Sequence, residues 1–247
     1  MTAKKIALGL LALLLTSGAA AAQTIDLQTL FPAGDATVSG RIVQLLVVMT
    51  VLSVAPGLLI MVTSFTRFLI AFSFLRAGLG LQTTPNNLIL VSLALFMTLF
   101  VMAPTFQSAW EEGVRPMVEN KISQQDGYTK TTAPFRTFMQ ANVRDKDLAL
   151  FEGMSVERFG EANKAGPDDL RVLMPAFMIS ELRRGFEIGF LVTLPFLIID
   201  LVVATIMTAM GMMMMPPTVV ALPLKILFFV LVDGWSLLVG ALVKSFV

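Results

Sequence analysis

Few residues of this sequence can do acid–base, nucleophilic or metal chemistry. It contains no Cys and no His. This excludes thiol catalysis, disulfides, Cys/His metal sites and the side chain that most often transfers protons near neutral pH. The candidates that remain are the charged residues inside long apolar segments: Asp200, Lys225 and Asp233. Charges in such segments are functional candidates by default, and they are usually paired inside a helical bundle.

Asp200 and Lys225 are spaced so that they can form an ion pair. They lie 13 residues before and 12 residues after Met213, which falls at the turn between two apolar segments. At the rise of an α-helix, both lie about 18–20 Å from the turn, so an antiparallel hairpin brings them level. Pairing lowers the cost of burying the two charges. The simplest interpretation is that the pair fixes the register of the hairpin. A proton or ion relay and pairing between subunits are the alternatives.

Asp233 raises the alternative of an intramembrane aspartyl protease that uses Asp200 and Asp233 together. Two such carboxylates must lie close enough to share a proton and a water. Asp233 follows Met213 by 20 residues, which places it about 10 Å further along its helix than the level of Asp200. Because of this stagger and the nearby Lys225, we expect no catalytic residue, and we expect no metal site.

A run of methionines lies at the same turn. Six of the nine residues from Met207 to Met215 are Met, and Pro216 and Pro217 follow. Consecutive Met residues cannot all face one side of a helix, and Gly211 with the two prolines favours a loop at the hairpin tip. Met is flexible and polarizable, so it can repack around changing neighbours. Such loops around a ring of subunits would form a soft apolar seal; anchoring to lipid or to a partner is the other interpretation.

The composition is that of a membrane protein. Apolar residues make up 56% of the 247 residues, charged residues make up 14%, and the mean hydropathy is +0.80. A soluble domain is about 45–50% apolar and about 25% charged. A disordered chain, which needs low hydrophobicity and high charge, is excluded. The net charge of +1 gives the chain no overall field that would attract nucleic acid.

Four apolar segments must position these groups: 42–65, 88–103, 186–210 and 219–243. A bilayer core of about 30 Å needs roughly 20 helical residues, and each segment is either short or interrupted, for example by Pro56-Gly57 or Pro223. None shows the strict alternation of barrel strands, so we expect helices. The predicted fold class is an all-α membrane protein built from bent helical hairpins.

The remaining segments give the predicted domain organisation. Residues 1–22 have the basic start, apolar core and small-residue end of a cleaved signal peptide; an uncleaved signal anchor is the alternative. We then expect an extracytoplasmic leader at 23–41, a first hairpin at 42–105, a soluble extracytoplasmic insert at 106–184 and a second hairpin at 185–247 with its tip at 207–217. The insert holds 23 of the 35 charged residues. Its acidic helix starts predict that it is mostly helical.

Several motifs occur in the order in which one known family has them. They are Thr63-Ser64-Phe65-Thr66-Arg67 with Arg76 and Gly80, Pro85-Asn86-Asn87, and the segments 175–182, 194–200, 211–217, 222–225 and 232–235. With these motifs the sequence resembles the FliP/SctR family of type III secretion export-gate subunits, from Ile42 to the last residue. Residues 23–41 and parts of 106–170 match little. Pro85-Asn86 stands where the family often has two prolines.

The resemblance implies a structural, pore-forming subunit of the flagellar export gate, without a cofactor. It implies a location in the bacterial inner membrane at the flagellar basal body, largely on the periplasmic side. The implied partners are further copies of the chain, taken as a pentamer, FliQ-like and FliR-like subunits, other export-apparatus proteins and unfolded protein substrates. The equivalent subunit of a virulence secretion system is the main alternative. A small-molecule transporter would show internal repeats and a polar site at the midplane, and neither is evident.

The resemblance also implies roles for particular residues. It identifies Met210, Met212, Met213, Met214 and Met215 as a methionine gasket, shaped by Gly211, Pro216 and Pro217. We expect Glu181 and Arg67 to make contacts between subunits, with a basic residue of a neighbour as the partner of Glu181. A plain acid at a helix start is the alternative for Glu181.

Overall fold

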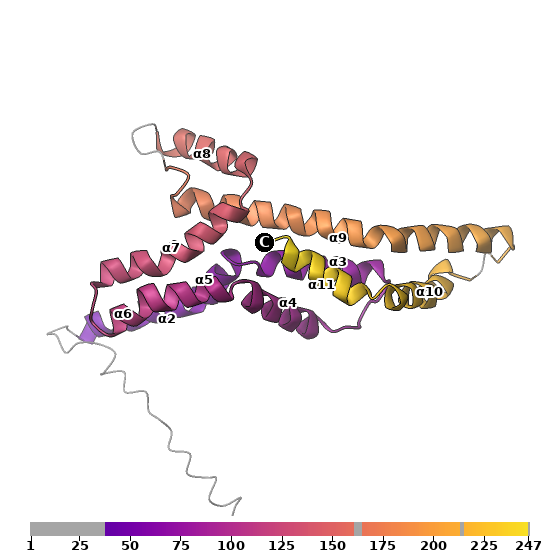
Figure 1. The fold of residues 1–247 in the computed structure, drawn as a ribbon, viewed down its shortest axis with the longest axis horizontal. Helices are drawn as coiled ribbons and strands as arrows, with labels where there is room; N and C mark the ends of the chain where they lie inside the picture. Colours follow the sequence, from indigo (N-terminus) through magenta and orange to yellow (C-terminus); the bar gives the residue numbers. More distant parts are fainter. Residues whose placement is uncertain (1–37, 161–164, 213–214, 247) are drawn as a thin grey trace, which may run out of the picture. The chain divides into compact units, whose positions relative to one another are not determined.

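The computed structural model describes residues 38–160, 165–212 and 215–246, and every regular element in these ranges is a helix (Figure 1). This confirms the predicted all-α class. The expected signal peptide at 1–22 and most of the expected leader lie outside the described residues, as do Met213 and Met214. The chain divides into two compact units, 1–53 and 54–247. Helix α2 crosses the boundary between the two units, and the other helices discussed below lie in the second unit.

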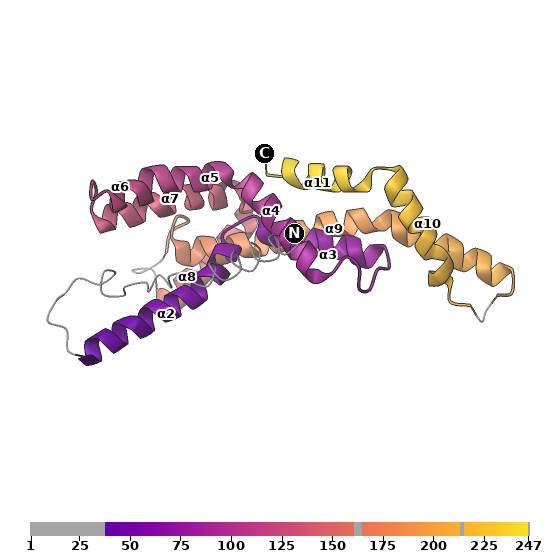
Figure 2. The ribbon, with the colours of Figure 1, turned by 90° about the horizontal axis from the view of Figure 1, so that it is seen from below.

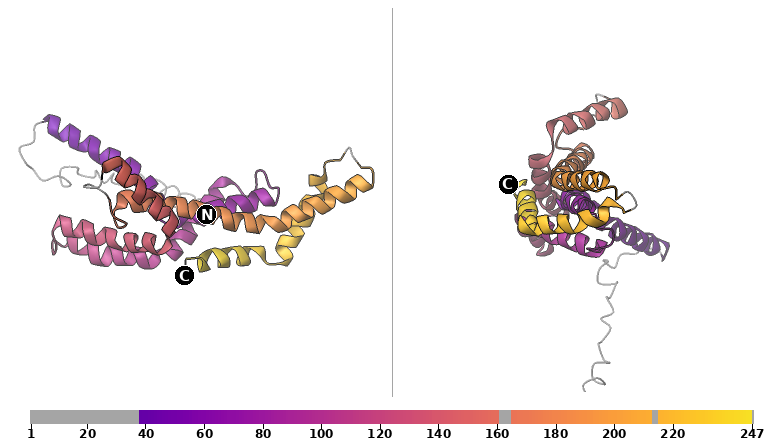
Figure 3. Two further views of the ribbon diagram at one scale, coloured as in Figure 1. Left: turned by 90° about the horizontal axis from the view of Figure 1, so that it is seen from above. Right: turned by 90° about the vertical axis from the view of Figure 1, so that its right-hand side faces the viewer.

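The helices follow one another with short connections. Their bounds are α2 Val38–Met61, α3 Phe65–Gly78, α4 Asn87–Val101, α5 Ala103–Ser108, the π-helix η1 Ala109–Val114, α6 Arg115–Val118, α7 Gln124–Asn142, α8 Asp145–Phe159, α9 Leu170–Ala209, α10 Pro217–Leu231 and α11 Gly234–Lys244. The segment predicted as a soluble insert is helical, and within it α7 lies beside η1 (Figure 3).

Side-chain caps set two of the helix starts that position the polar residues. The hydroxyl of Ser123 accepts a hydrogen bond of 3.1 Å from the backbone N–H of Asp126 and so caps α7. The carboxylate of Asp169 accepts a hydrogen bond of 2.9 Å from the N–H of Arg171 and caps α9. Hydrogen bonds from the Arg171 side chain and backbone lower the pKa of Asp169 to about 2. The α9 cap therefore stays ionised over the whole physiological range, as the dipole of the helix favours.

Helix α9 is the longest element of the fold. Its 40 residues extend over about 60 Å, which is twice the thickness of a bilayer core. The helix passes without a break through residues 184–185, where the sequence analysis placed the boundary between insert and second hairpin. The change from charged to apolar residues at this point alters the surroundings that suit the helix, while its backbone continues unbroken.

By length and composition alone, α9 can cross a membrane. Among the helices of the described residues, no other passes this test by itself. Two bent pairs of helices pass the same test if each is taken as one broken span. They are α4 with the segment Ala103–Val118, bent by 64°, and α10 with α11, bent by 63° (Figure 2). The second bend occurs at Asp233, whose φ is +51°. The predicted span 219–243 is thus two helices joined at an angle.

The main hydrophobic core surrounds α3. Phe68, Phe72 and Leu75 are almost fully buried there, together with Leu238 and Leu242 of α11. Smaller apolar clusters lie between α7 and the start of α9, around Met139 and Phe177, and between α9 and α10, around Met207 and Ala221.

Helices α3 and α9 run side by side and in the same direction. Small residues on α9 allow this close approach: a Cβ on Gly185 would lie 3.1 Å from Ile70, and one on Gly189 would lie 2.7 Å from the ring of Phe74. The two glycines are four residues apart, the spacing with which helices in membranes often bring their backbones together.

Substituting Gly189 by Ala should therefore destabilise the protein by about 1–3 kcal/mol, because the added methyl group overlaps the Cβ and ring of Phe74. Gly153→Ala in α8 is the matched control, since its Cβ meets open space and alanine favours a helix by about 0.5–1 kcal/mol. Thermal unfolding of the detergent-solubilised protein measures both changes. Equal unfolding temperatures for the two variants would refute this account of the helix pair.

Candidate functional site

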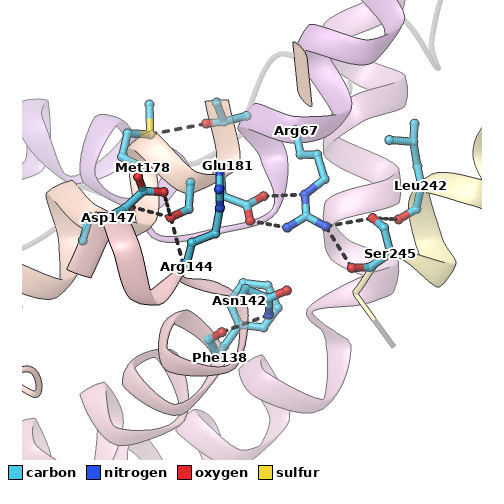
Figure 4. Close-up of polar contacts among 12 residues, drawn as sticks. Arg67, Phe138, Asn142, Arg144, Asp147, Met178, Glu181, Leu242 and Ser245 are labelled. Atoms are coloured by element: carbon cyan, nitrogen blue, oxygen red, sulfur yellow. Dashed lines mark hydrogen bonds and ion pairs between the residues drawn. The ribbon is translucent and has the colours of Figure 1, made fainter. Parts of the chain in front are cut away.

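The polar residues of the apolar helices gather at the two ends of the α3–α9 pair. At the first end, Arg67 of α3 and Glu181 of α9 form a two-fold hydrogen-bonded ion pair (Figure 4). The Nε–H of Arg67 donates to Oε2 of Glu181 at 2.8 Å, and Nη2 donates to Oε1. Both side chains are 0% exposed. A buried ion pair is tolerable only with such complete hydrogen bonding.

Within the chain, Glu181 and Arg67 are each other's partner. The contacts with other subunits that we expected of these two residues stay a prediction. The cause of the pairing is the α3–α9 packing: Glu181, Gly185 and Gly189 recur every four residues on one face of α9 and lie against Arg67, Ile70 and Phe74 of α3. The glycine spacing was the sequence signal for a close helix contact at this place, but it does not name the partner helix.

The rest of the Arg67 guanidinium is bound by residues that follow α11. Nη1 donates to the backbone oxygen of Ser245 at 3.0 Å and to its hydroxyl at 2.8 Å. The guanidinium carbon lies 3.5 Å from the centre of the Phe246 ring. All three nitrogens of Arg67 are thus hydrogen-bonded, and the cation also lies over an aromatic ring.

A second buried polar contact ties α8 to α9. The hydroxyl of Ser180, which is fully buried, donates to Oδ2 of Asp147 at 2.7 Å and accepts the backbone N–H of Arg144 at 3.1 Å (Figure 4). The contact between Ser180 and Asp147 was not predicted, because two positions 33 residues apart carry no periodic signal.

At the far end of the α3–α9 pair the structure brings Asp200 and Lys225 together. The Nζ of Lys225 donates to Oδ2 of Asp200 at 2.6 Å and to the backbone oxygen of Gly78 at 2.9 Å. The Lys225 side chain is 7% exposed and the Asp200 side chain 38%. The second carboxylate oxygen of Asp200 is buried and has no hydrogen-bond partner in the described part of the chain. Asp233 is exposed at the α10–α11 bend and makes no polar contact with Asp200.

The hairpin tip lies between α9 and α10. Gly211 directly follows Met210, the C-cap residue of α9. Its φ is +73°, a conformation that glycine adopts without strain. Pro216 precedes α10 and Pro217 is its first residue, where the missing N–H costs nothing. Of the expected gasket, Met210, Met212 and Met215 are exposed. Met207 is different, since it is buried between α9 and α10.

These features define an all-α membrane protein whose helices are joined by ion pairs, one of them fully buried. In residues 38–160, 165–212 and 215–246 no group of three or more acidic side chains could hold a metal ion.

The model of the FliP family matches residues 48–242 of the sequence. Flagellar biosynthetic protein FliP of Rhizobium meliloti is 57% identical over 96% of this chain and 97% of that protein. The protein of the same name from Agrobacterium fabrum is 60% identical over 86% of each chain, and the one from Bacillus subtilis is 48% identical over 88% and 97%. The chain belongs to the FliP family.

The buried pair at the first end should be costly to break. Glu181→Gln leaves the Arg67 charge buried without its carboxylate, and we expect a loss of about 3–5 kcal/mol in unfolding free energy. Glu119→Gln is the control, because its pairs with Arg115 and Lys121 are exposed and contribute about 0–1 kcal/mol. Denaturant unfolding in detergent measures both. Losses of similar size would contradict the assignment.

The pair at the far end should behave as a register contact. Asp200→Lys alone and Lys225→Asp alone each place two like charges together, and we expect both to reduce assembly. The double exchange restores an attractive pair and should restore assembly. Recovery of the intact complex after detergent extraction is the measurement, and failure of the double variant to recover would rule out a register role.

Proposed function

We propose that the chain is a structural, pore-forming subunit of the flagellar type III export gate and not an enzyme. In this role it conducts unfolded flagellar proteins across the inner membrane at the flagellar basal body. The observation that carries the proposal is the 57% identity to a flagellar biosynthetic protein over 96% of the chain. The match includes the hairpin tip and both charged pairs, since the family model covers residues 48–242.

The exposed apolar surface supports a subunit of a larger membrane complex. Large apolar side chains are exposed along α4, α9 and α10; examples are Phe100, Leu201 and Leu231, which are 68%, 68% and 75% exposed. Surface of this extent must be covered by lipid or by other proteins. We infer a ring of copies, taken as five, with FliQ-like and FliR-like subunits covering part of it and other export-apparatus proteins beside it.

The length of α9 supports a location partly outside the bilayer. A helix of about 60 Å with charged residues such as Arg183 and Glu187 in its middle cannot lie wholly in a hydrocarbon core of about 30 Å. The bent pairs would likewise be exposed to lipid at their kinks if they crossed a bilayer alone. We therefore propose that the complex lies largely on the periplasmic side of the inner membrane.

The hairpin tip is the proposed seal of the pore. Met210, Met212 and Met215 are exposed although they are apolar, and they lie between Gly211 and the prolines at 216 and 217 or next to them. Flexible thioether side chains supplied by several copies would close a narrow pore to ions and still yield to a passing polypeptide.

Deleting Met212–Met215 should make cells that express the complex leak ions, because the proposed apolar barrier is then missing. The leak is measured as membrane conductance, with Met154→Ser as the control, since Met154 is an exposed methionine of α8. Complex recovery from the same cells shows whether the deletion variant assembles. A deletion variant that assembles and leaves the membrane conductance unchanged would contradict the sealing role.

A further inference from the structure

The segment Ser245–Phe246, here termed the clasp, joins elements that are otherwise far apart in the sequence. It follows α11 and binds Arg67 of α3, 178 residues earlier, through the two hydrogen bonds from Nη1 and the contact between guanidinium and ring. The Ser245 hydroxyl in turn donates to the Leu242 oxygen at 2.7 Å, which keeps its lone pairs turned to Arg67 (Figure 4).

The clasp completes the hydrogen bonding of Arg67 and covers the Arg67–Glu181 pair. Two nitrogens of Arg67 are bound by Glu181 and the third by Ser245 alone. If the clasp moved away, Nη1 would be left without its acceptors beside a pair that is now 0% exposed. Loss of the hydrogen-bond acceptors of a buried charged donor is strongly unfavourable in free energy. The movement therefore requires water to enter the core at Arg67.

The Phe246 ring extends the connection to the insert. It stacks against Phe68 of α3 at 5.7 Å between ring centres and against Phe138 of α7 at 6.0 Å. Phe138 also contacts Phe177 of α9 at 5.9 Å. The same ring that covers Arg67 thus packs against a helix of the insert, so a displacement of the ring removes a packing partner of α7.

The arm formed by α10 and α11 is attached to the rest of the second unit through both helices: α10 packs on α9 around Met207 and Ala221, and α11 packs near α3. Leu238 and Leu242 enter the core around α3, and the clasp completes this attachment. The other end of the same arm begins at the hairpin tip, since α10 starts at Pro217. The arm consequently runs from the tip to the clasp.

We propose that the clasp couples the α10–α11 arm to the insert helix α7. Movement of α11 away from α3 pulls Phe246 from Phe138 and uncovers Arg67, so the arm and α7 loosen together or remain closed together. This coupling goes beyond the proposed function and does not depend on it, because it is a property of one chain. In an export gate it would link the state of the tip to the state of the insert.

The absence of cysteine from the sequence allows a direct test with single thiols. Leu242→Cys reports on α11, Met139→Cys on α7 and Ser155→Cys on α8; the native residues are 0%, 1% and 4% exposed. The rate of alkylation of each thiol in the detergent-solubilised full-length chain measures how often its site opens. The three reporters are combined with Phe246→Leu, which keeps an apolar side chain and removes the aromatic ring.

Phe246→Leu should raise the alkylation rates at positions 242 and 139 together, on the order of tenfold, because the cation–π and ring contacts are lost. The rate at 155 should stay unchanged, since α8 is attached to α9 through Ser180 and Asp147. Phe228→Leu is the matched control: the Phe228 ring contacts Phe196 of α9. Among the described residues it makes no ring contact with Phe246 or Phe138, so the substitution should change neither rate.

Faster labelling at 242 with no change at 139 would overturn the coupling, and so would faster labelling at all three positions, which indicates general unfolding. If Phe246→Leu does not yield folded protein, Ser245→Ala is used, because it removes one acceptor of Arg67 and no packing. It should raise both rates by a smaller factor, and unchanged rates in that variant would also overturn the proposal.

Discussion

The close parallel packing of α3 on α9 is the constraint on which the rest of the second unit depends. Residues spaced every four along α9 meet residues of α3 in sequence: Glu181 binds Arg67, Gly185 and Gly189 admit Ile70 and Phe74, and Thr193 lies against Gly78. Each end of this contact carries an ion pair, since Lys225 also binds the oxygen of Gly78 beside Asp200. The ion pairs fix the register, and the glycines set the distance between the helices.

Sequence reasoning reached the far ion pair and missed the near one for a physical reason. Asp200 and Lys225 belong to one hairpin, so counting residues from its tip gives their relative height. Arg67 and Glu181 are 114 residues apart, and no local count relates two helices that meet only in the tertiary fold. The glycines at 185 and 189 predict a close helix contact, but they do not name the partner helix.

The helical class and the apolar segments followed from hydrophobicity and from the backbone's need for hydrogen bonds, whereas element boundaries did not. Arg183 and Glu187 mark a change of surroundings, and the boundary between insert and second hairpin was predicted there from composition. The helix continues because nothing there interrupts the backbone hydrogen bonds. The bend after Leu231 interrupts a helix inside a continuous apolar segment. Gly234 packs so tightly on Phe229 there that a Cβ would lie 2.1 Å from the ring, and a hydropathy profile cannot predict such a contact.

The two ends of the α3–α9 contact differ in how completely their charges are satisfied, and this difference locates where the chain can yield. Arg67 and Glu181 are fully buried and every nitrogen of Arg67 is bound. Asp200 is 38% exposed and keeps one oxygen without a partner in the described residues. Breaking the near pair leaves two fully buried charges unpaired, whereas in the far pair only Lys225 is buried and the Asp200 side chain is 38% exposed. Movement is therefore cheapest at the hairpin-tip end and most costly at the end that Ser245 and Phe246 close.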